Sequence, residues 1–239
     1  MSSNTPRILV IIGSPRKYGS CLKLASIAER GVKDAGGIPE RVFLYDYNIK
    51  PCIGCVSDDQ YVCRFPCIIE DDDFNKLGEK MLETDGYIFV SPIYWYSVSG
   101  LWKNFIDRMT SFENMIHHTG RSLLEGKVAG FIVVGNDSGG IHAIATLMVT
   151  MNSYGIHIPP WALAYSHERE DVLNDQQAVM DAYNVGYIVA KAARILKGDV
   201  VWYNPRVDID DLRQYAYKES LNYNSYKLER LELFKKKKV

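Results

Sequence analysis

Five short apolar runs recur along the chain, and segments with the apolar spacing of a helix separate them. The runs that we expect to form strands are 7–14, 38–47, 86–92, 127–136 and 157–166. The first, third and fourth are nearly continuous in apolar and β-branched residues, which is typical of strands buried in a parallel sheet. The fifth contains Pro159-Pro160, which confine it to an edge or delay its start. Strands that alternate with helices predict a doubly wound α/β fold with a five-stranded parallel sheet.

Apolar residues at helical spacing indicate the helices between these strands. From Ser20 one apolar face runs along the chain until Gly36-Gly37 ends the helix. The residues of this face are Cys21, Leu24, Ala25, Ala28 and Val32. The other expected helices are 71–85, 99–112, 139–155 and 175–198.

Residues 199–239 follow the last expected helix and continue neither the strand nor the helix alternation. They contain Trp202, several tyrosines and a run of four lysines at 235–238. We therefore expect one domain at 1–198 and a C-terminal arm at 199–239, which packs on the domain or on a partner subunit.

The charge balance excludes some classes of partner. The chain has 28 Lys and Arg against 29 Asp and Glu, a net charge of −1, which offers no electrostatic basis for binding nucleic acid or an anionic membrane. No apolar run reaches membrane-spanning length, and the one near the N-terminus is too short for the core of a signal peptide. We expect a cytoplasmic protein, in which cysteines usually stay reduced.

The loop after the first strand reads GSPRKYGSC and leads into a helix. Its glycines, hydroxyls and cation are Gly13, Gly19, Ser14, Ser20 and Arg16. Together with the backbone N–H groups of the helix N-terminus they indicate an anion site, in which Arg16 pairs with phosphate oxygens. The alternative is an ordinary turn with a surface arginine. The loop matches neither GxGxxG nor GxxxxGK[ST], so a dinucleotide-binding Rossmann site is disfavoured and a P-loop is excluded.

The loops after the third and fourth strands complete this edge of the sheet. The first reads SPIYWYSVSG (91–100), and its exposed aromatic residues suit a flat aromatic ligand, the alternative being a buried aromatic cluster. The second reads GNDSGG (135–140), and its glycines allow the backbone to run close beside a ligand. A phosphate site, an aromatic wall and a glycine-rich wall together fit a phosphorylated flat ring, for which FMN is the natural candidate.

These loops carry a resemblance to a known family. The segments GSPRKYGSC, SPIYWYSVSGLWKNFIDR, GNDSGG, PCIGC and CIIEDD resemble motifs of the NADPH-dependent FMN reductase group of flavodoxin-like proteins, especially its multimeric-flavodoxin and iron–sulfur flavoprotein branch. The resemblance covers roughly residues 7–165. It implies the flavodoxin-like strand order 2-1-3-4-5 and a homodimer or homotetramer with the flavin near a subunit interface.

The resemblance also implies which residues surround FMN. Those expected around its phosphate are Ser14, Arg16, Ser20, Cys21 and Leu22, those along the isoalloxazine are Pro92, Ile93, Tyr94 and Trp95, and those on its other side are Asn136, Gly139 and Gly140. The family has a threonine hydroxyl where this chain has the thiol of Cys21, a weaker donor, so looser FMN binding is expected.

The family's chemistry lies on the flavin, so no side chain is expected to act as an acid or base. The resemblance implies an FMN-dependent oxidoreductase that takes hydride from NAD(P)H and passes electrons to a quinone, a flavin or another small acceptor. The alternative is an electron-transfer protein that holds FMN, with or without an iron–sulfur cluster, and has no nicotinamide site of its own. A third alternative is a flavodoxin-like binding module without flavin.

Four of the five cysteines fall within PCIGCVSDDQYVCRFPC, with the spacing C-x2-C-x7-C-x3-C. They are Cys52, Cys55, Cys63 and Cys67. Iron–sulfur flavoproteins use a compact four-cysteine motif with a tighter middle, so a [4Fe-4S] cluster is one hypothesis and cysteines that bind no metal are another. Structural zinc and disulfides are the remaining alternatives; seven residues between the pairs are few for a zinc ribbon.

Overall fold

The structure is a computed structural model that describes residues 5–198, 208–221 and 224–236. The chain divides into two compact units, Met1–Tyr203 and Asn204–Val239. No helix of the described residues is long and apolar enough to cross a membrane.

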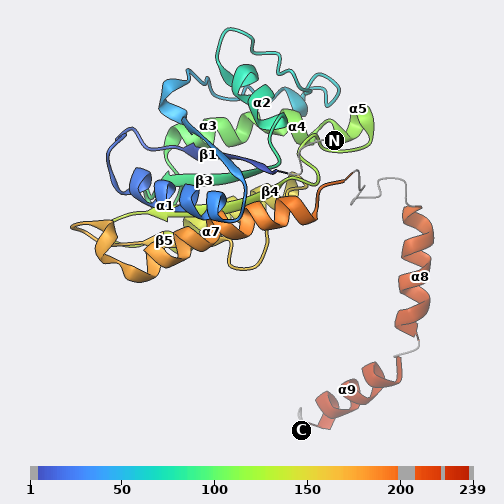
Figure 1. Cartoon of the computed structure of the whole chain (residues 1–239). Helices are drawn as coiled ribbons and strands as arrows, with labels where there is room; N and C mark the ends of the chain where they lie inside the picture. Colours follow the sequence, from blue (N-terminus) through green and yellow to red (C-terminus); the bar gives the residue numbers. More distant parts are fainter. Residues whose placement is uncertain (1–4, 199–207, 222–223, 237–239) are drawn as a thin grey trace. The chain divides into compact units, whose positions relative to one another are not determined.

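The first unit contains one parallel five-stranded sheet with the order β2-β1-β3-β4-β5 (Figure 1), which confirms the expected order. Its strands are β1 Arg7–Ile12, β2 Ile38–Phe43, β3 Gly86–Pro92, β4 Val128–Val134 and β5 Leu163–Ser166. The fifth strand is shorter than expected. His157 makes a single bridge to Val128, and regular pairing resumes only at Leu163, after the two prolines, which have no N–H to donate.

Helices cover both faces of the sheet (Figure 1). The helices of one face are α1 Ser20–Asp34 and α7 Gln176–Ile195, and those of the other are α2 Phe74–Leu82, α3 Gly100–Arg108 and α6 Gly140–Ser153. The short helices α4 Thr110–Glu113 and α5 Ile116–Thr119 follow α3, and the 3-10 turns are η1 Leu44–Asp46, η2 Cys55–Ser57 and η3 Val172–Asn174. Because side chains of a strand alternate between faces, Leu9 and Ile11 pack under one layer and Ile8 and Val10 under the other.

Two glycines allow α1 and α7 to pack closely. A Cβ on Gly186 would lie 1.8 Å from the carbonyl oxygen of Ala28, and a Cβ on Gly31 would lie 2.1 Å from that of Tyr183. Glycine is unfavourable inside a helix, so its presence in both helices reflects this contact between the two backbones.

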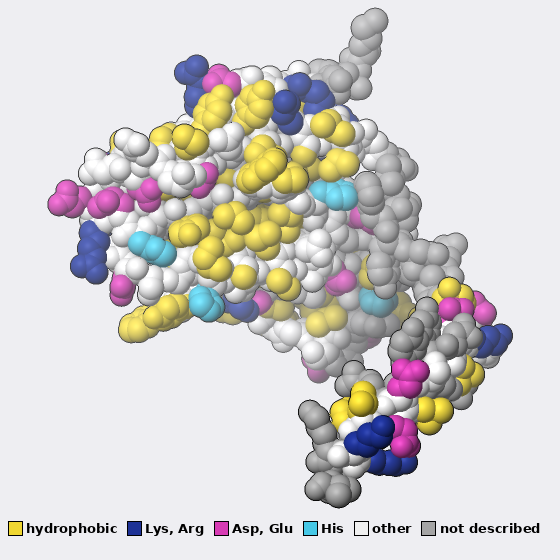
Figure 2. Space-filling view, turned by 90° about the horizontal axis from the view of Figure 1, so that it is seen from below, with side chains coloured by type: hydrophobic (Ala, Val, Ile, Leu, Met, Phe, Trp, Pro, Cys, Tyr) yellow, Lys and Arg dark blue, Asp and Glu magenta, His cyan; other side chains and the backbone are white. Residues whose placement is uncertain are grey.

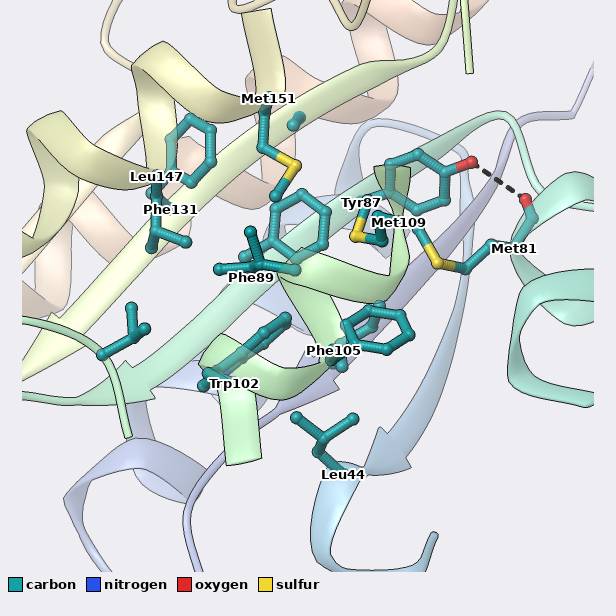
Figure 3. Close-up of a cluster of buried hydrophobic side chains, with 14 of the residues drawn as sticks. Leu44, Met81, Tyr87, Phe89, Trp102, Phe105, Met109, Phe131, Leu147 and Met151 are labelled. Atoms are coloured by element: carbon teal, nitrogen blue, oxygen red, sulfur yellow. Dashed lines mark hydrogen bonds between the residues drawn. The ribbon is translucent and has the colours of Figure 1, made fainter. Parts of the chain in front are cut away.

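The opposite layer has an aromatic core (Figure 3). Phe89 of β3 stacks on Phe131 of β4, with ring centroids 5.9 Å apart, and meets Trp102 of α3 edge-on at 5.5 Å. The Tyr87 hydroxyl donates to the carbonyl oxygen of Met81, so its polar end is satisfied inside the core. This packing fixes α3 against the carboxyl end of β3.

Two helices begin or end elsewhere than the sequence indicates. The acidic residues that precede α2 bind backbone N–H groups of the chain before the cysteine segment, at Asn48 and Lys50, so the helix begins at Phe74 rather than residue 71. The expected helix 99–112 ends at Arg108 and is continued by α4.

The second unit contains α8 Ile209–Leu221 and α9 Asn224–Lys236. Trp202 and Tyr203 of the expected arm lie outside the described residues. That the arm packs on the domain or on a partner subunit stays a prediction.

Candidate functional site

A pocket of about 290 Å³ lies at the edge of the sheet where the strands end. Four loops line it, those after β1, β3, β4 and β5. Ligands of open α/β sheets bind outside the carboxyl ends of the strands, next to the point where strand order reverses. The pocket is in that place, since β1 pairs with both β2 and β3.

The N-terminus of α1 contributes backbone donors to this pocket. No side chain caps the helix at Gly19, and no acidic residue lies in its first turn. The first N–H groups of a helix lack intrahelical acceptors, and the helix dipole favours an anion there. Ser20 and Cys21 belong to this turn and line the pocket, so their backbone N–H groups can bind an anion.

Ser14 and Arg16 stand beside this helix N-terminus. The backbone N–H of Arg16 donates to the Ser14 hydroxyl at 3.2 Å, so the first loop folds back on itself. The Arg16 guanidinium lies 5.4 Å from the ring centroid of Tyr18 and lines the pocket. A cation, hydroxyls and free backbone N–H groups in one place fit a phosphate group.

Trp102 fixes the position of the first loop. A Cβ on Gly13 would lie 1.8 Å from Trp102 Nε1. That nitrogen donates to the carbonyl oxygen of Val90, and the Gly13 N–H donates to the same oxygen at 2.8 Å. The Ser99 hydroxyl donates to the carbonyl oxygen of Gly13. Only glycine fits here, and the loop that carries Ser14 is thereby tied to β3 and α3.

The Cys21 thiol is protonated at neutral pH. Burial raises the pKa of Cys21 to about 12, although the hydrogen bond with Ser14 and the charge of Arg16 lower it. This side chain therefore offers a ligand a weak S–H donor and no negative charge.

The loop after β3 forms a tight turn. The N–H and C=O groups of Tyr94 and Ser97 pair with each other, and the central residues Trp95 and Tyr96 have φ values of 50° and 65°. Non-glycine residues rarely adopt this left-handed conformation. It places Trp95 in solvent, where 93% of its surface is exposed, and leaves Tyr94 to line the pocket with Pro92 and Ile93.

The loop after β4 contributes Gly135 and Asn136 to the pocket. Gly139 and Gly140 instead contact other side chains: a Cβ on Gly139 would lie 2.9 Å from Tyr96, and one on Gly140 would lie 3.0 Å from Tyr165. Gly139 has a φ of 92° and is the N-cap residue that precedes α6, so its conformational freedom serves this turn.

The loop after β5 closes the pocket with Glu168, Arg169 and Glu170, none of which the sequence motifs indicate. The only available signal was positional, since the loop follows a strand of the same parallel sheet. The expected strand at 157–166 ends at the same residue as β5, Ser166, so the sequence locates this loop but marks none of its side chains.

The pocket brings together most of the expected FMN-binding residues. Those that line it are Ser14, Arg16, Ser20, Cys21, Pro92, Ile93, Tyr94 and Asn136. Those that do not line it are Leu22, Trp95, Gly139 and Gly140. Leu22 packs partly against the core between the sheet and α1.

The four clustered cysteines form a second site of interest. Cys63 is buried, and burial together with the neighbouring thiols of Cys55, Cys67 and Cys52 raises the pKa of Cys63 to about 12. The segment thus gathers all four thiols, which are free cysteines in the structure.

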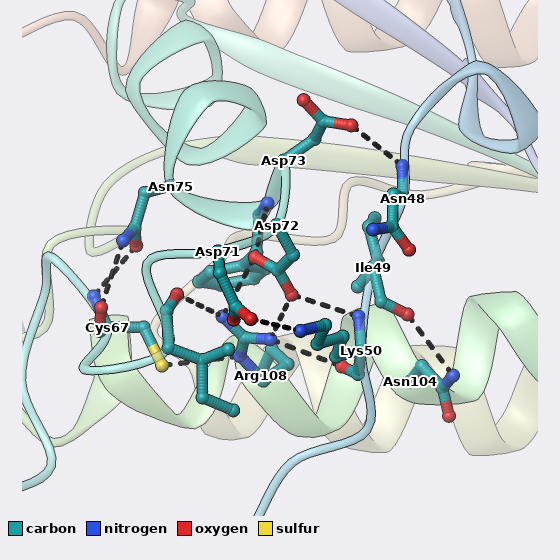
Figure 4. Close-up of polar contacts among 12 residues, drawn as sticks. Asn48, Ile49, Lys50, Cys67, Asp71, Asp72, Asp73, Asn75, Asn104 and Arg108 are labelled. Atoms are coloured by element: carbon teal, nitrogen blue, oxygen red, sulfur yellow. Dashed lines mark hydrogen bonds and ion pairs between the residues drawn. The ribbon is translucent and has the colours of Figure 1, made fainter.

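A buried arginine anchors this cysteine loop to α3 (Figure 4). Arg108 Nε donates to Cys67 Sγ at 3.2 Å, Nη1 donates to Asp72 Oδ2 at 2.6 Å, and Nη2 donates to the carbonyl oxygen of Ile69. Both side chains of the Arg108–Asp72 ion pair are fully buried. Burial opposes the charge of Asp72, but hydrogen bonds from Arg108 and from the Lys50 and Phe74 amides outweigh it and lower its pKa.

Further polar contacts hold the rest of the loop. Asn75 exchanges two hydrogen bonds with the backbone of Cys67, and Asn114 donates to the carbonyl oxygens of Gln60 and Cys63. Within the described residues, no three His, Cys, Asp or Glu side chains are arranged to hold a metal ion.

Comparison with known proteins assigns the family. The family model described as NADPH-dependent FMN reductase matches residues 6–170. The chain belongs to this family. An iron-sulfur flavoprotein of Archaeoglobus fulgidus is 34% identical over 124 residues, which are 52% of this chain and 52% of that protein. An iron-sulfur flavoprotein of Methanocaldococcus jannaschii is 29% identical over 203 residues, 80% of this chain and 99% of that protein.

Solved structures of known proteins have the same architecture as this chain. The crystal structure of RosB with bound 8-demethyl-8-formylriboflavin-5'-phosphate has a TM-score of 0.70 at 19% identity, covering 90% of this chain and 88% of RosB. An archaeal flavodoxin has a TM-score of 0.52 at 12% identity, covering 79% of this chain and 99% of the flavodoxin. At these identities the likeness shows the flavodoxin-like fold. The chain spans about half the length of the A. fulgidus relatives that it matches.

Proposed function

We propose that this protein is an FMN-dependent oxidoreductase that takes hydride from NAD(P)H and passes electrons to a quinone, a flavin or another small acceptor. The observation that carries the proposal is the pocket at the ends of β1, β3 and β4, where Arg16, two hydroxyls and an uncapped helix N-terminus converge. The family to which the chain belongs supports the same cofactor and reductant.

The residues of the pocket fit FMN by their chemistry. Ser14, Arg16 and Ser20, with the first backbone N–H groups of α1, would hold the phosphate. Ile93 and Tyr94 would cover one side of the ring system, and the backbone at 134–136 would lie along the other. When bound, FMN supplies the redox chemistry, accepting hydride and releasing electrons.

The side chains of the pocket orient the cofactor and exclude water rather than transfer protons. The Cys21 thiol is held neutral by burial, with its pKa raised to about 12, so it is unsuited to act as a base near pH 7. Beside the pocket, the exposed rings of Tyr94, Trp95 and Tyr96 offer flat apolar surface on which a nicotinamide or a quinone could stack.

A partner subunit could complete this surface. Large apolar side chains of α6 and of the segment leading into β5 are exposed, among them Ile141, Val149 and Trp161. Figure 2 shows apolar side chains gathered over one face of the molecule. Contiguous exposed apolar surface is typical of interfaces, which supports the prediction of a homodimer or homotetramer.

The second candidate is an electron-transfer protein that holds FMN and an iron–sulfur cluster. Both compared relatives are named iron-sulfur flavoproteins, and the segment at 52–67 carries four free cysteines, although the described residues hold no group of three arranged to bind a metal ion. Four cysteines are the ligand set of such clusters. Iron and sulfide analysis of protein purified without oxygen tests the cluster, and less than stoichiometric amounts of both would remove it.

An assay of NADPH oxidation with a soluble quinone tests the main proposal. The full chain loaded with FMN should turn over, and Arg16→Gln should raise the Kd for FMN about tenfold, because one charge-assisted contact to phosphate is lost. Arg30→Gln is the matched control, since Arg30 pairs with Asp34 on the exposed surface of α1. Equal FMN affinity of the Arg16 variant and the control would contradict the proposed phosphate site.

A further inference from the structure

We propose that Arg169 is a specificity-determining residue of the pocket, a second cation that binds a phosphate monoester. The inference rests on the proposed function, and two phosphates share the required chemistry: the 5'-phosphate of FMN and the 2'-phosphate of NADPH. Arg169 lies in the loop after β5. The sequence motifs that predict the FMN site lie in the loops after the first, third and fourth strands and do not include this residue.

The loop at 167–171 is fixed on both sides of the pocket. Asp171 accepts from Lys23 of α1 at 2.7 Å, which ties its far end to the helix that carries the anion site. His167 Nε2 accepts from the N–H of Gly140 at 3.2 Å, which ties its near end to the start of α6. A residue between these anchors keeps a defined position relative to the pocket.

Arg169 is itself oriented by the loop after β4. Its Nε donates to the carbonyl oxygen of Asn136 at 3.0 Å, and Asn136 lines the same pocket. In the part of the chain that the structure describes, its two terminal nitrogens have no hydrogen-bond acceptor. Those nitrogens are the donors with which an arginine binds phosphate in a bidentate manner.

The charged side chains that line the pocket would repel an anion if Arg16 were their only cation. Those side chains are Arg16, Glu168, Arg169 and Glu170. Without Arg169, two carboxylates would face one guanidinium, and an incoming phosphate dianion would be repelled. With Arg169 the side-chain charges balance, and the helix N-terminus then tips the site toward anions.

The weak hydrogen-bond donor at Cys21 also supports a phosphate-binding role for Arg169. A buried thiol with a raised pKa gives a phosphate oxygen little hydrogen-bonding energy. A bidentate arginine from the loop after β5 would supply charge-assisted hydrogen bonds, which are about twice as strong as neutral ones. Arg169 would therefore offset the missing hydroxyl.

For the test, flavin is removed from the wild-type full chain and from its Arg169→Gln variant. Each protein is then titrated with FMN and with riboflavin. If FMN is the source of the phosphate, the Kd for FMN rises about tenfold in the variant, while the Kd for riboflavin and the KM values for NADPH and NADH stay unchanged. If NADPH is the source, only the KM for NADPH rises. Arg169→Lys should restore part of the affinity, and Arg30→Gln should change nothing.

Unchanged constants for both phosphates would overturn the inference. So would a parallel loss of FMN and riboflavin affinity, which would show that Arg169 acts only by holding the loop at Asn136. A wild-type protein that binds FMN no more tightly than riboflavin would instead refute the proposed phosphate pocket, and the Arg169 inference with it. The two failures are thus distinguished by the behaviour of the wild type.

Discussion

Replacing Arg108 with methionine should lower the free energy of unfolding by about 3–5 kcal/mol, the cost of leaving one member of a buried ion pair without its partner. Both side chains of the pair with Asp72 are fully buried. Asp72 would keep two backbone donors, the N–H groups of Lys50 and Phe74, so its charge would remain partly stabilised. Methionine fills most of the space of the arginine stem, which keeps the cavity contribution small.

The same substitution removes every contact that joins Arg108 to the cysteine loop. The Cys67 thiol would lose its N–H donor, and the carbonyl oxygens of Lys50 and Ile69 would be left buried with fewer partners. An unsatisfied buried polar group costs about 1–3 kcal/mol. We therefore expect Arg108→Met to lower the free energy of unfolding by an amount in the upper half of the range of about 3–5 kcal/mol.

Urea unfolding followed by circular dichroism at pH 7, with linear extrapolation, measures the change. A double variant with Asp72→Asn, which removes both charges and keeps an acceptor oxygen for one of the two backbone N–H groups, should lose less than the sum of the single changes by about 1–3 kcal/mol. Lys103→Met is the control on the same helix, because its ion pair with Asp107 is exposed and worth less than about 1 kcal/mol. A loss below about 1 kcal/mol for Arg108→Met, or strict additivity, would refute the structural role of the pair.

Three further outcomes follow from the same structure. Gly13→Ala should destabilise the fold by about 1–3 kcal/mol in the same unfolding assay, because its Cβ would overlap Trp102. Cys21→Thr should lower the Kd for FMN several-fold in a fluorescence titration, since it replaces a thiol by a hydroxyl at the pocket. The lowered pKa of Asp72 stabilises the fold above its usual value of 3.8 and ceases to do so as pH falls through the folded-state value; acid titrations of the wild type and Asp72→Asn should differ in that window.

The sheet could be predicted from the sequence because its central strands are buried on both faces. Continuous apolar runs at β1, β3 and β4 predict buried parallel strands, and their alternation with helices predicts the doubly wound fold class. The strand order 2-1-3-4-5 came from the family resemblance. The fifth strand was harder, since Pro159-Pro160 interrupt the pattern and pairing begins only at Leu163.

The pocket was predicted in outline, and its details depend on contacts between distant segments. Trp95 was expected at the flavin because aromatic rings suit a flat ligand, but the left-handed turn at 94–97 exposes it. Arg169 was missed because its relation to Asn136 joins two loops that are 33 residues apart. No local pattern encodes such a contact.

The cysteine loop shows the same limit. Its four cysteines are evident in the sequence, yet the side chain that fixes Cys67 comes from Arg108, 41 residues away on α3. The sequence placed Arg108 in a helix and gave no reason to bury it. Only the fold brings it to Asp72 and the thiol.

The visible spectrum of the anaerobically purified full chain with FMN, before and after addition of NADPH, tests the central claim most directly. We predict a two-banded flavin spectrum that bleaches on addition of NADPH. A flavin spectrum that neither NADPH nor NADH changes would contradict the reductase and favour the electron-transfer protein. A chain that retains no flavin after incubation with FMN would contradict the assignment of the pocket itself.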